Sequence, residues 1–495
     1  MRVSRGLELA AIAALVFAYA YLIQPTGENQ EAHYGLTRAL ADGKPYIDDY
    51  ARGELATVDS TTFEGHRFAA KAPGLAAFSV PVYVVLEAAG VDPDENVHRV
   101  LWALHLWASV LPALVLLLLV RDLANRLEPG LGIASAVALG GATLLLPFAN
   151  LFFSHVLAAT LAFGAYVLLH RERHGPPDLR RVALAGLLLG LGVVVEYPIG
   201  LAGVVLFVYA IARDDKLRRA LAFGVPAVLG ALPALVFNQW AFGSPFHFPY
   251  EGWTLGPDTK SYPGLFGLTM PDPHTTLALL FAPAGLASLA AAAVGAVVVY
   301  RRRDRADTLL LAGLPVAFLL YNAASVDPFG GASPGPRYLV TTLPFLAVLL
   351  APALRVVPGV VLGQFAVSGA FLAAATLTSP LAAADTEVIH RLRTGGYVRS
   401  VLDFVGIGGG AADLPFVLAL LFAALVALAA VRPHLRAPDA PAFAISLVAW
   451  AVIASQARRL LEEGPSWTTD AVLIAVAVAA AAALAWVYRR PWPQR

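Results

Sequence analysis

The sequence contains no cysteine and few charged residues. None of its 495 residues is Cys, two are Met, and 14% are charged. The lack of cysteine excludes disulfides, thiolate nucleophiles and cysteine-ligated zinc or iron–sulfur sites. So low a charged fraction, with 58% hydrophobic residues and a mean hydropathy of +0.68, argues against a water-soluble chain. The composition therefore predicts an integral membrane protein.

Sequence signatures of nucleotide and metal sites are also missing. There is no P-loop sequence, no HExxH motif and no His/Asp array with metal spacing, and Gly186, Gly190 and Gly192 fall inside an apolar run. The net charge is +1, and no basic patch is interleaved with aromatic residues, so we expect no nucleic-acid partner. A membrane enzyme that faces outward without a nucleotide site must draw its activated substrate from the bilayer. Polyprenyl-phosphate sugars are the usual donors of this kind.

Apolar runs of membrane-spanning length recur along the chain and predict an all-α polytopic membrane protein with about fourteen transmembrane helices. We place the runs at residues 7–23, 98–120, 131–148, 151–170, 182–195, 198–212, 220–240, 276–300, 308–325, 338–353, 358–378, 414–431, 442–455 and 470–488. They form a single predicted transmembrane domain, residues 1–495. The first run is interpreted as a retained anchor and not as a signal peptide.

Basic residues fall on alternate connections between these runs, which predicts that those connections are cytoplasmic. They are Arg2, Arg5, Arg121, Arg126, Arg171, Arg173, Arg180, Arg181, Arg213, Lys216, Arg218, Arg219, Arg301, Arg302, Arg303, Arg305, Arg432, Arg436, Arg489 and Arg490. Both termini are then cytoplasmic in a prokaryotic plasma membrane. Residues 24–97 and 379–413 become the first and a late extracytoplasmic loop.

The first extracytoplasmic loop, residues 24–97, carries most of the polar chemistry. Glu28 and Glu31 follow the first apolar run, and their spacing of three puts both carboxylates on one side of a helical turn. Lys71 precedes a Pro-Gly turn, and residues 34–41 and 76–88 have the mixed character of interfacial helices. We expect the two ends of the loop to fold together at the membrane surface as a reaction site.

Three segments resemble motifs of a known family. They are Gln30-Glu31-Ala32-His33-Tyr34, Ala70-Lys71-Ala72-Pro73-Gly74 and Pro336-Arg337-Tyr338-Leu339. In this order they resemble the GT-C superfamily of integral membrane glycosyltransferases, especially the branch of the protein mannosyltransferases and the lipid A aminoarabinose transferase. Relatives have Asp where this chain has Gln30 and Ala70. The carboxylate role therefore passes to Glu31, with Glu28 as the alternative.

The resemblance implies an inverting sugar transfer from a polyprenyl-phosphate donor to an acceptor on the extracytoplasmic face. Glu31 or Glu28 would act as general base, and Lys71 and Arg337 would bind the departing phosphate. The residues expected to line the cavity are Glu196, Tyr197, His155, His247, Tyr250, Asp327 and Tyr338. We assign no metal ligands, although a requirement for a divalent metal stays open because the loop carries the scattered carboxylates of Asp48, Asp49 and Asp59.

Other interpretations remain. The two glutamates are equally consistent with solvated loop charges or a helix start, and Lys71 with an interfacial side chain whose amine reaches water. A lipid-linked sugar flippase or transporter, and a cell-envelope ligase or polymerase of the O-antigen kind, are the alternative functions. The sugar and the acceptor, whether glycan, lipid or protein, stay open.

Overall fold

The computed structural model describes residues 3–251, 268–282, 289–302, 305–381, 385–408, 410–462 and 466–489. Parts of the segment 241–275, between two predicted spans, and of the predicted late extracytoplasmic loop 379–413 lie outside these ranges. The chain divides into two compact units. Unit 1 comprises Met1–Leu22, Leu117–Pro147 and Met270–Arg495, and unit 2 comprises Ile23–Leu116 and Phe148–Thr269. Whether they act as one transmembrane domain, as predicted, stays a prediction.

The described helices confirm the predicted all-α polytopic class. Eight are long and apolar enough to cross a membrane: Val97–Leu127, Lys216–Phe242, Arg305–Ala323, Arg337–Val356, Pro358–Thr378, Ala411–His434, Asp439–Gln456 and Trp467–Arg489. Four shorter apolar helices are Gly74–Ala88, Gly132–Ala142, Ile199–Ile211 and Ala292–Arg301. The chain is an integral membrane protein.

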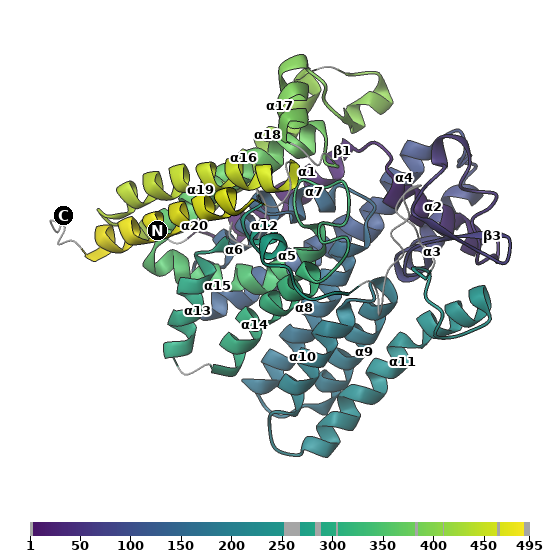
Figure 1. Cartoon of the computed structure of the whole chain (residues 1–495), viewed down its shortest axis with the longest axis horizontal. Coiled ribbons are helices and arrows are strands. Elements are labelled where there is room, and N and C mark those ends of the chain that lie inside the picture. Colours follow the sequence, from purple (N-terminus) through teal and green to yellow (C-terminus); the bar gives the residue numbers. More distant parts are fainter. Residues whose placement is uncertain are drawn as a thin grey trace. The chain divides into compact units, whose positions relative to one another are not determined.

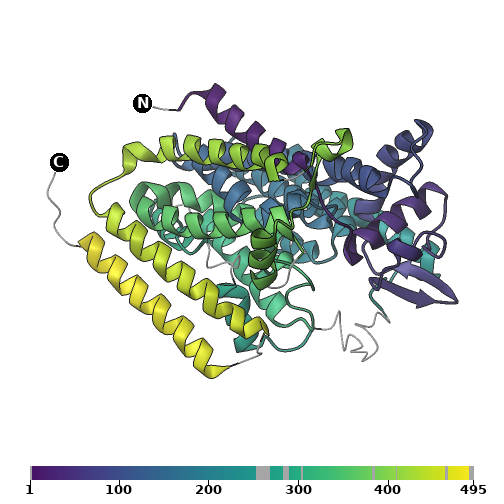
Figure 2. The ribbon, with the colours of Figure 1, turned by 90° about the horizontal axis from the view of Figure 1, so that it is seen from above.

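Unit 1 is a bundle of helices (Figure 1), in which most residues of α6 (Gly132–Ala142) and α15 (Leu343–Val356) are buried. Its α-helices are α1 (Arg5–Tyr21), α6 (Gly132–Ala142), α12 (Pro273–Phe281), α13 (Ala292–Arg301), α14 (Arg305–Ala323), α15 (Leu343–Val356), α16 (Pro358–Thr378), α17 (Asp385–Thr394), α18 (Leu414–Val431), α19 (Asp439–Glu462) and α20 (Trp467–Arg489). Short elements are η5 (Arg337–Thr342), β4 (Arg399–Ser400), η6 (Val401–Val405), η7 (Gly410–Asp413) and η8 (Arg432–His434). Helices α19 and α20 lie side by side, as Figure 2 also shows.

Unit 2 combines a helical bundle with the folded outer loop. Its elements are α2 (Glu28–Ala41), η1 (Gly53–Leu55), β2 (Ser60–Phe63), β3 (His66–Ala69), α3 (Gly74–Ala88), α4 (Val97–His105), η2 (Leu106–Val110), α8 (Ser154–Arg173), α9 (Leu179–Val195), α10 (Ile199–Ile211) and α11 (Lys216–Phe242). Three elements cross the unit boundary along the chain: β1 (Leu22–Ile23), α5 (Leu111–Leu127) and α7 (Leu145–Ala149).

Glycines bring α9 and α11 into close contact. A Cβ atom on Gly186 would collide with the carbonyl oxygen of Phe223, and one on Gly190 with that of Ala227. Small residues allow membrane helices to approach backbone to backbone. Gly186 and Gly190 are therefore packing residues, in agreement with their exclusion from a nucleotide-binding motif.

The predicted first extracytoplasmic loop folds as two α-helices around a β-hairpin. Helix α2 includes residues 34–41 and α3 includes residues 76–88, so both segments predicted as interfacial helices are helical. Strands β2 and β3 pair in antiparallel register, Ser60 opposite Ala69 and Phe63 opposite His66. The turn residues Glu64 and Gly65 have φ angles of 48° and 86°. Two central residues with positive φ are typical of a tight hairpin turn.

Apolar side chains hold the folded outer loop onto the membrane helices of unit 2. Ala32 and Leu36 share one face of α2 and are fully buried together with Phe68 of β3. Phe237 and Phe242 at the end of α11 belong to the same cluster. The cluster positions the N-terminus of α2, with its two glutamates, next to the segment that follows the hairpin.

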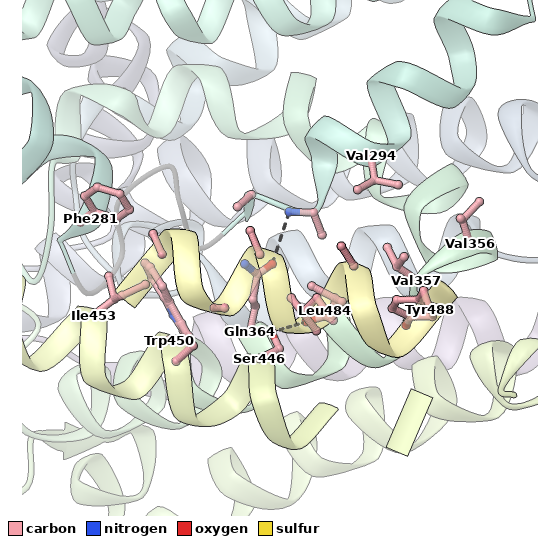
Figure 3. Close-up of a pocket in the computed structure, with 18 of the residues that line it drawn as sticks. Phe281, Val294, Val356, Val357, Gln364, Ser446, Trp450, Ile453, Leu484 and Tyr488 are labelled. Atoms are coloured by element: carbon pink, nitrogen blue, oxygen red, sulfur yellow. Dashed lines mark hydrogen bonds between the residues drawn. The ribbon is translucent and has the colours of Figure 1, made fainter. Parts of the chain in front are cut away.

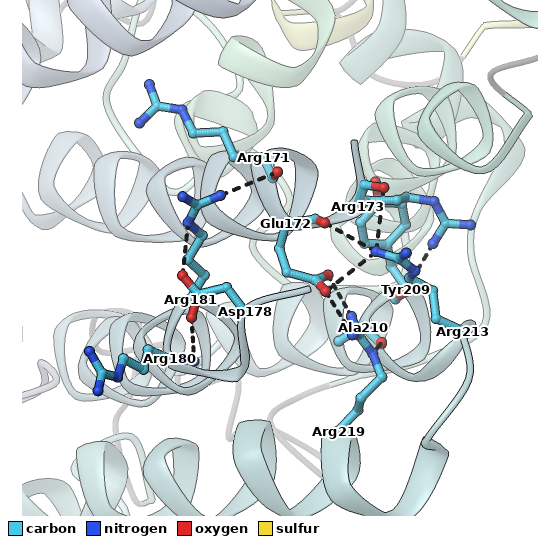
Figure 4. Close-up of polar contacts among 10 residues, drawn as sticks. All are labelled: Arg171, Glu172, Arg173, Asp178, Arg180, Arg181, Tyr209, Ala210, Arg213 and Arg219. Atoms are coloured by element: carbon cyan, nitrogen blue, oxygen red, sulfur yellow. Dashed lines mark hydrogen bonds and ion pairs between the residues drawn. The ribbon is translucent and has the colours of Figure 1, made fainter. Parts of the chain in front are cut away.

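A buried ion-pair cluster fixes the other end of this bundle (Figure 4). The Glu172 carboxylate is fully buried, and the two terminal nitrogens of Arg219 donate to its oxygens at 2.9 and 2.7 Å. Arg213 also donates to Glu172, at 3.3 Å. The pairing joins the last turn of α8 to the first turn of α11, next to connections that are predicted to be cytoplasmic.

Candidate active site

Glu31 lies in the first turn of α2, with 7% of its surface exposed. Burial raises the pKa of its carboxyl group from 4.5 to about 7, opposed by a hydrogen bond with the Thr26 side chain. The nearby carboxylates of Glu28 and Asp59 raise this pKa further. A carboxyl group that titrates near neutral pH is suited to accept a proton at physiological pH. Glu31 therefore has the properties of a general base.

Glu28, the alternative base, is exposed and contacts the segment before the hairpin. Its carboxylate accepts a hydrogen bond from the Val58 backbone N–H at 2.6 Å, and its backbone carbonyl accepts one from the Thr57 hydroxyl at 2.8 Å. These two contacts attach the start of α2 to the segment before the hairpin. The structure thus shows Glu28 in contact with this segment, and its role as a base stays a prediction.

Lys71 forms a buried ion pair with Asp59. The Lys71 Nζ lies 2.7 Å from the Asp59 carboxylate, and about a tenth of each side chain is exposed. The hairpin creates this pair, because Asp59 and Ala70 flank its two strands and are joined by a backbone hydrogen bond of 2.9 Å. From the sequence alone, Asp59 is one of several scattered carboxylates of the loop. Residues 60–69 form two short segments on either side of Glu64-Gly65, a pattern that indicates a β-hairpin. A hairpin there would predict that Asp59 lies close to Lys71.

Gln30, at the position where relatives carry Asp, connects α2 to the segment before α8. Its amide nitrogen donates to the Pro25 carbonyl at 2.8 Å, and its amide oxygen accepts from the Phe152 N–H at 3.0 Å. The buried His33 ring packs edge-on against Phe152, with centroids 6.2 Å apart. Helix α2 is therefore fixed against the residues that lead into Ser154 and His155.

His155 and Glu196 form a buried dyad at the ends of α8 and α9. The His155 Nδ1 lies within hydrogen-bond distance of a Glu196 carboxylate oxygen, and the Ser154 hydroxyl donates to the same carboxylate at 3.1 Å. The rings of Phe148 and Phe153 enclose the imidazole. The structure thus brings together two residues predicted separately for the cavity.

The Lys71 segment packs close to this dyad. A Cβ atom on Gly74 would lie 2.6 Å from the backbone of Val194 and Val195, the two residues before Glu196. Only glycine allows the start of α3 to approach α9 this closely. Within unit 2, the Gln30 and Gly74 contacts therefore gather Glu31, the Lys71–Asp59 pair and the His155–Glu196 dyad in one region.

Three further predicted cavity residues also lie in unit 2. The Tyr197 ring packs edge-on against Tyr250, with centroids 6.0 Å apart. The His247 ring stacks on Phe242 at 4.5 Å, and its Nδ1 lies 3.6 Å from the Glu251 carboxylate. Tyr197, which follows Glu196 in the chain, thus packs against Tyr250. His247 packs instead against Phe242 at the end of α11.

The remaining predicted site residues, Arg337, Asp327 and Tyr338, lie in unit 1. The Asp327 carboxylate accepts hydrogen bonds from the N–H groups of Gly330 and Gly331 at 3.1 and 3.2 Å. Gly330, with a φ of 83°, leaves no space for a Cβ beside the Arg337 side chain. The Arg337 guanidinium lies 5.6 Å from the Tyr338 ring centroid and is buried. Asp327 thus shapes a turn that holds Arg337.

The carboxylates considered for a divalent metal are all engaged by the protein. Asp48 contacts the His66 ring and the Arg67 N–H, both at 2.6 Å. Asp49 pairs with Lys44 at 3.1 Å, and Asp59 pairs with Lys71. Each of these three carboxylates is therefore held by its own partner residues, and a divalent-metal requirement stays an open prediction.

The fold resembles that of a solved membrane protein. The structure of ArnT from Cupriavidus metallidurans bound to undecaprenyl phosphate matches with a TM-score of 0.52 and 17% identity, over 98% of this chain and 75% of ArnT. The apo form of the same protein matches with a TM-score of 0.49, 16% identity and the same coverage. No protein-family profile and no curated sequence matches this chain. The chain therefore shares the fold of the ArnT structure bound to undecaprenyl phosphate, in agreement with the fold expected from the sequence motifs.

Proposed function

Because the chain has the GT-C fold, we propose that it is a glycosyltransferase that moves a sugar from a polyprenyl-phosphate donor to an acceptor on the extracytoplasmic face. The observation that carries this proposal is Glu31, a buried carboxyl group with a pKa of about 7. It lies in the predicted outer loop, in a unit that also contains the Lys71–Asp59 pair. The undecaprenyl phosphate bound to ArnT is a donor carrier of the proposed class.

In the proposed reaction, the Glu31 carboxylate accepts the proton of the acceptor hydroxyl or amine as that group attacks the anomeric carbon of the sugar. The new glycosidic bond forms while the bond to the donor phosphate breaks, and the polyprenyl phosphate leaves with the electron pair. Attack from the opposite side inverts the anomeric configuration. The general base contributes typically about 10²- to 10⁴-fold to the rate of such a step.

The departing phosphate needs positive charge, and Lys71 is the proposed source in unit 2. Its ion pair with Asp59 holds the ammonium in place but also offsets its charge. A second cation is therefore needed to stabilise the phosphate. Arg337, predicted from the sequence for this role, has a planar guanidinium that can hold two phosphate oxygens. We propose that Glu196, oriented by His155 and Ser154, binds the acceptor.

The test is sugar transfer in membranes that contain the protein, a labelled polyprenyl-phosphate sugar and candidate acceptors. We expect Glu31→Gln to abolish product formation and Arg337→Gln to reduce it. Glu95→Gln, an exposed glutamate of the same loop, serves as the matched control and should retain activity. Wild-type turnover of Glu31→Gln would contradict the mechanism. Label that crosses the bilayer without forming a glycosylated product would instead identify a flippase.

A further inference from the structure

Unit 1 contains an elongated apolar groove of about 610 Å³ (Figure 3). Helix α19 contributes Ser446, Ala449, Trp450 and Ile453, and helix α20 contributes Ala477, Ala480, Ala481, Leu484, Ala485 and Tyr488. Spacings of three and four place each set on one face of its helix. Most of the α20 positions are alanine, so short side chains leave the space open.

The length of the groove matches one leaflet of a membrane. Along α20 the lining residues extend from Ala477 to Tyr488, which is roughly 16 Å at 1.5 Å per residue. The hydrocarbon core of a bilayer is about 30 Å thick, so one leaflet contributes about half of that. Figure 3 shows Tyr488, Val356 and Val357 gathered at one end, and Phe281 and Ile453 at the other.

The Tyr488 end of the groove is cationic. Arg436 lines it with 51% of its side chain exposed, and its guanidinium lies 5.8 Å from the Tyr488 ring centroid. Arg355 lies 3.4 Å from His434 in the neighbouring η8 segment, and Arg489 follows Tyr488 directly. The alternation of basic connections predicts that this end is cytoplasmic.

Nearby carboxylates are already engaged. Asp439 is buried and accepts hydrogen bonds from the Tyr488 hydroxyl and the Arg436 backbone N–H, both at 2.6 Å. It also pairs with the Arg436 guanidinium at 3.8 Å, which leaves Arg355 and Arg489 as the cations not offset by Asp439. Glu128 forms an ion pair with Arg302. Positive charge therefore dominates at the Tyr488 end of the groove. The rest of the groove lining is apolar apart from Gln364 and Ser446.

We infer that this groove binds an anionic phospholipid, with its phosphate at Arg436 and one acyl chain along the alanine face of α20. The positive charge at the Tyr488 end favours an anionic headgroup over a zwitterionic one. The depth of one leaflet suits the acyl chain of a lipid that resides in that leaflet. This site is separate from the proposed catalytic chemistry, because none of its lining residues has a role in sugar transfer.

Native mass spectrometry of the full-length protein in detergent, with added phosphatidylglycerol or phosphatidylcholine, tests the site. We expect wild-type protein to retain phosphatidylglycerol and not phosphatidylcholine. Arg436→Gln should weaken retention about fivefold, the contribution of one cation near an anionic headgroup. Ala481→Leu, which fills the groove, should weaken it as well. Arg180→Gln and Ala482→Leu, an exposed arginine of unit 2 and an exposed alanine of α20 outside the groove lining, are the matched controls and should bind like wild type.

Equal retention of the two phospholipids would overturn the inference. So would unchanged binding in both groove variants, or stronger binding of a polyprenyl phosphate than of phosphatidylglycerol. The two variants act independently, one on charge and one on space, so a folding defect in either leaves the other informative. Sugar-transfer activity is not a readout here, and loss of transfer in Glu31→Gln should leave phosphatidylglycerol retention intact.

Discussion

The raised pKa of Glu31 predicts how activity and stability depend on pH. If Glu31 is the base, transfer should increase with pH through about 7, because only the ionised carboxylate accepts a proton. At pH 6, roughly a tenth of the Glu31 carboxyl groups are ionised, so the rate should fall to about a tenth of its plateau. Measurement of initial rates from pH 5 to 9 with a saturating labelled donor gives this profile.

Stability should change in the opposite direction. The pKa of Glu31 in the folded state exceeds its unfolded value of 4.5, so the native protein binds more protons between pH 4.5 and about 7. The free energy of unfolding therefore falls as pH rises through this window. The cost is at most about 3 kcal/mol, since one pKa unit corresponds to 1.36 kcal/mol.

Glu31→Gln removes both effects, which separates a catalytic role from a structural one. This variant should lose transfer by about 10²-fold or more and yet be more stable than wild type at pH 8 in thermal unfolding assays in detergent. Glu28→Gln, the neighbouring variant, should keep transfer but shift the pH profile slightly towards lower pH, because it removes a negative charge that raises the pKa of Glu31. A flat pH profile for wild type, or a Glu31→Gln variant that is both active and less stable, would refute the reasoning.

Three further substitutions test the structure. Lys71→Ala leaves Asp59 buried without its cation and should destabilise the protein by about 3–5 kcal/mol. The double variant that also carries Asp59→Ala should regain the wild-type thermal midpoint but not sugar transfer. Restored transfer in the double variant would exclude a role for Lys71. Glu172→Gln should lower the free energy of unfolding by a similar amount in the same unfolding assay and leave the KM for the donor unchanged. A raised KM would contradict a purely structural role of Glu172. Gly186→Leu should lower the thermal midpoint by separating α9 from α11, whereas Gly203→Leu, on an open helix face, should not; equal shifts would argue against close packing.

The membrane class and the helical parts of the outer loop could be predicted from the sequence because they depend on local composition. Long apolar runs specify spanning helices, and the mixed segments around Tyr34 and Tyr83 became α2 and α3. The β-hairpin was not predicted, since its strands are only four residues each and the surrounding loop favoured helix.

The pairing of site residues was not predicted, because it depends on contacts between separate segments. The Lys71–Asp59 pair requires the hairpin, and the His155–Glu196 dyad requires two membrane helices to end beside each other. The choice between Glu28 and Glu31 depends on burial, which neighbouring positions in one helical turn do not reveal. The spacing places both glutamates on one turn, whereas the burial of Glu31 and the contact of Glu28 with Val58 distinguish them.

The amide of Gln30 makes this loop resistant to a simple motif swap. It gives one hydrogen bond to Pro25 and takes another from Phe152, a combination that an ionised carboxylate cannot reproduce because it has no proton to give. An aspartate installed there would forfeit the first bond and add a negative charge next to Glu31. Engineers who wish to graft a relative's acidic pair into this scaffold would therefore have to redesign the chain around Pro25 as well.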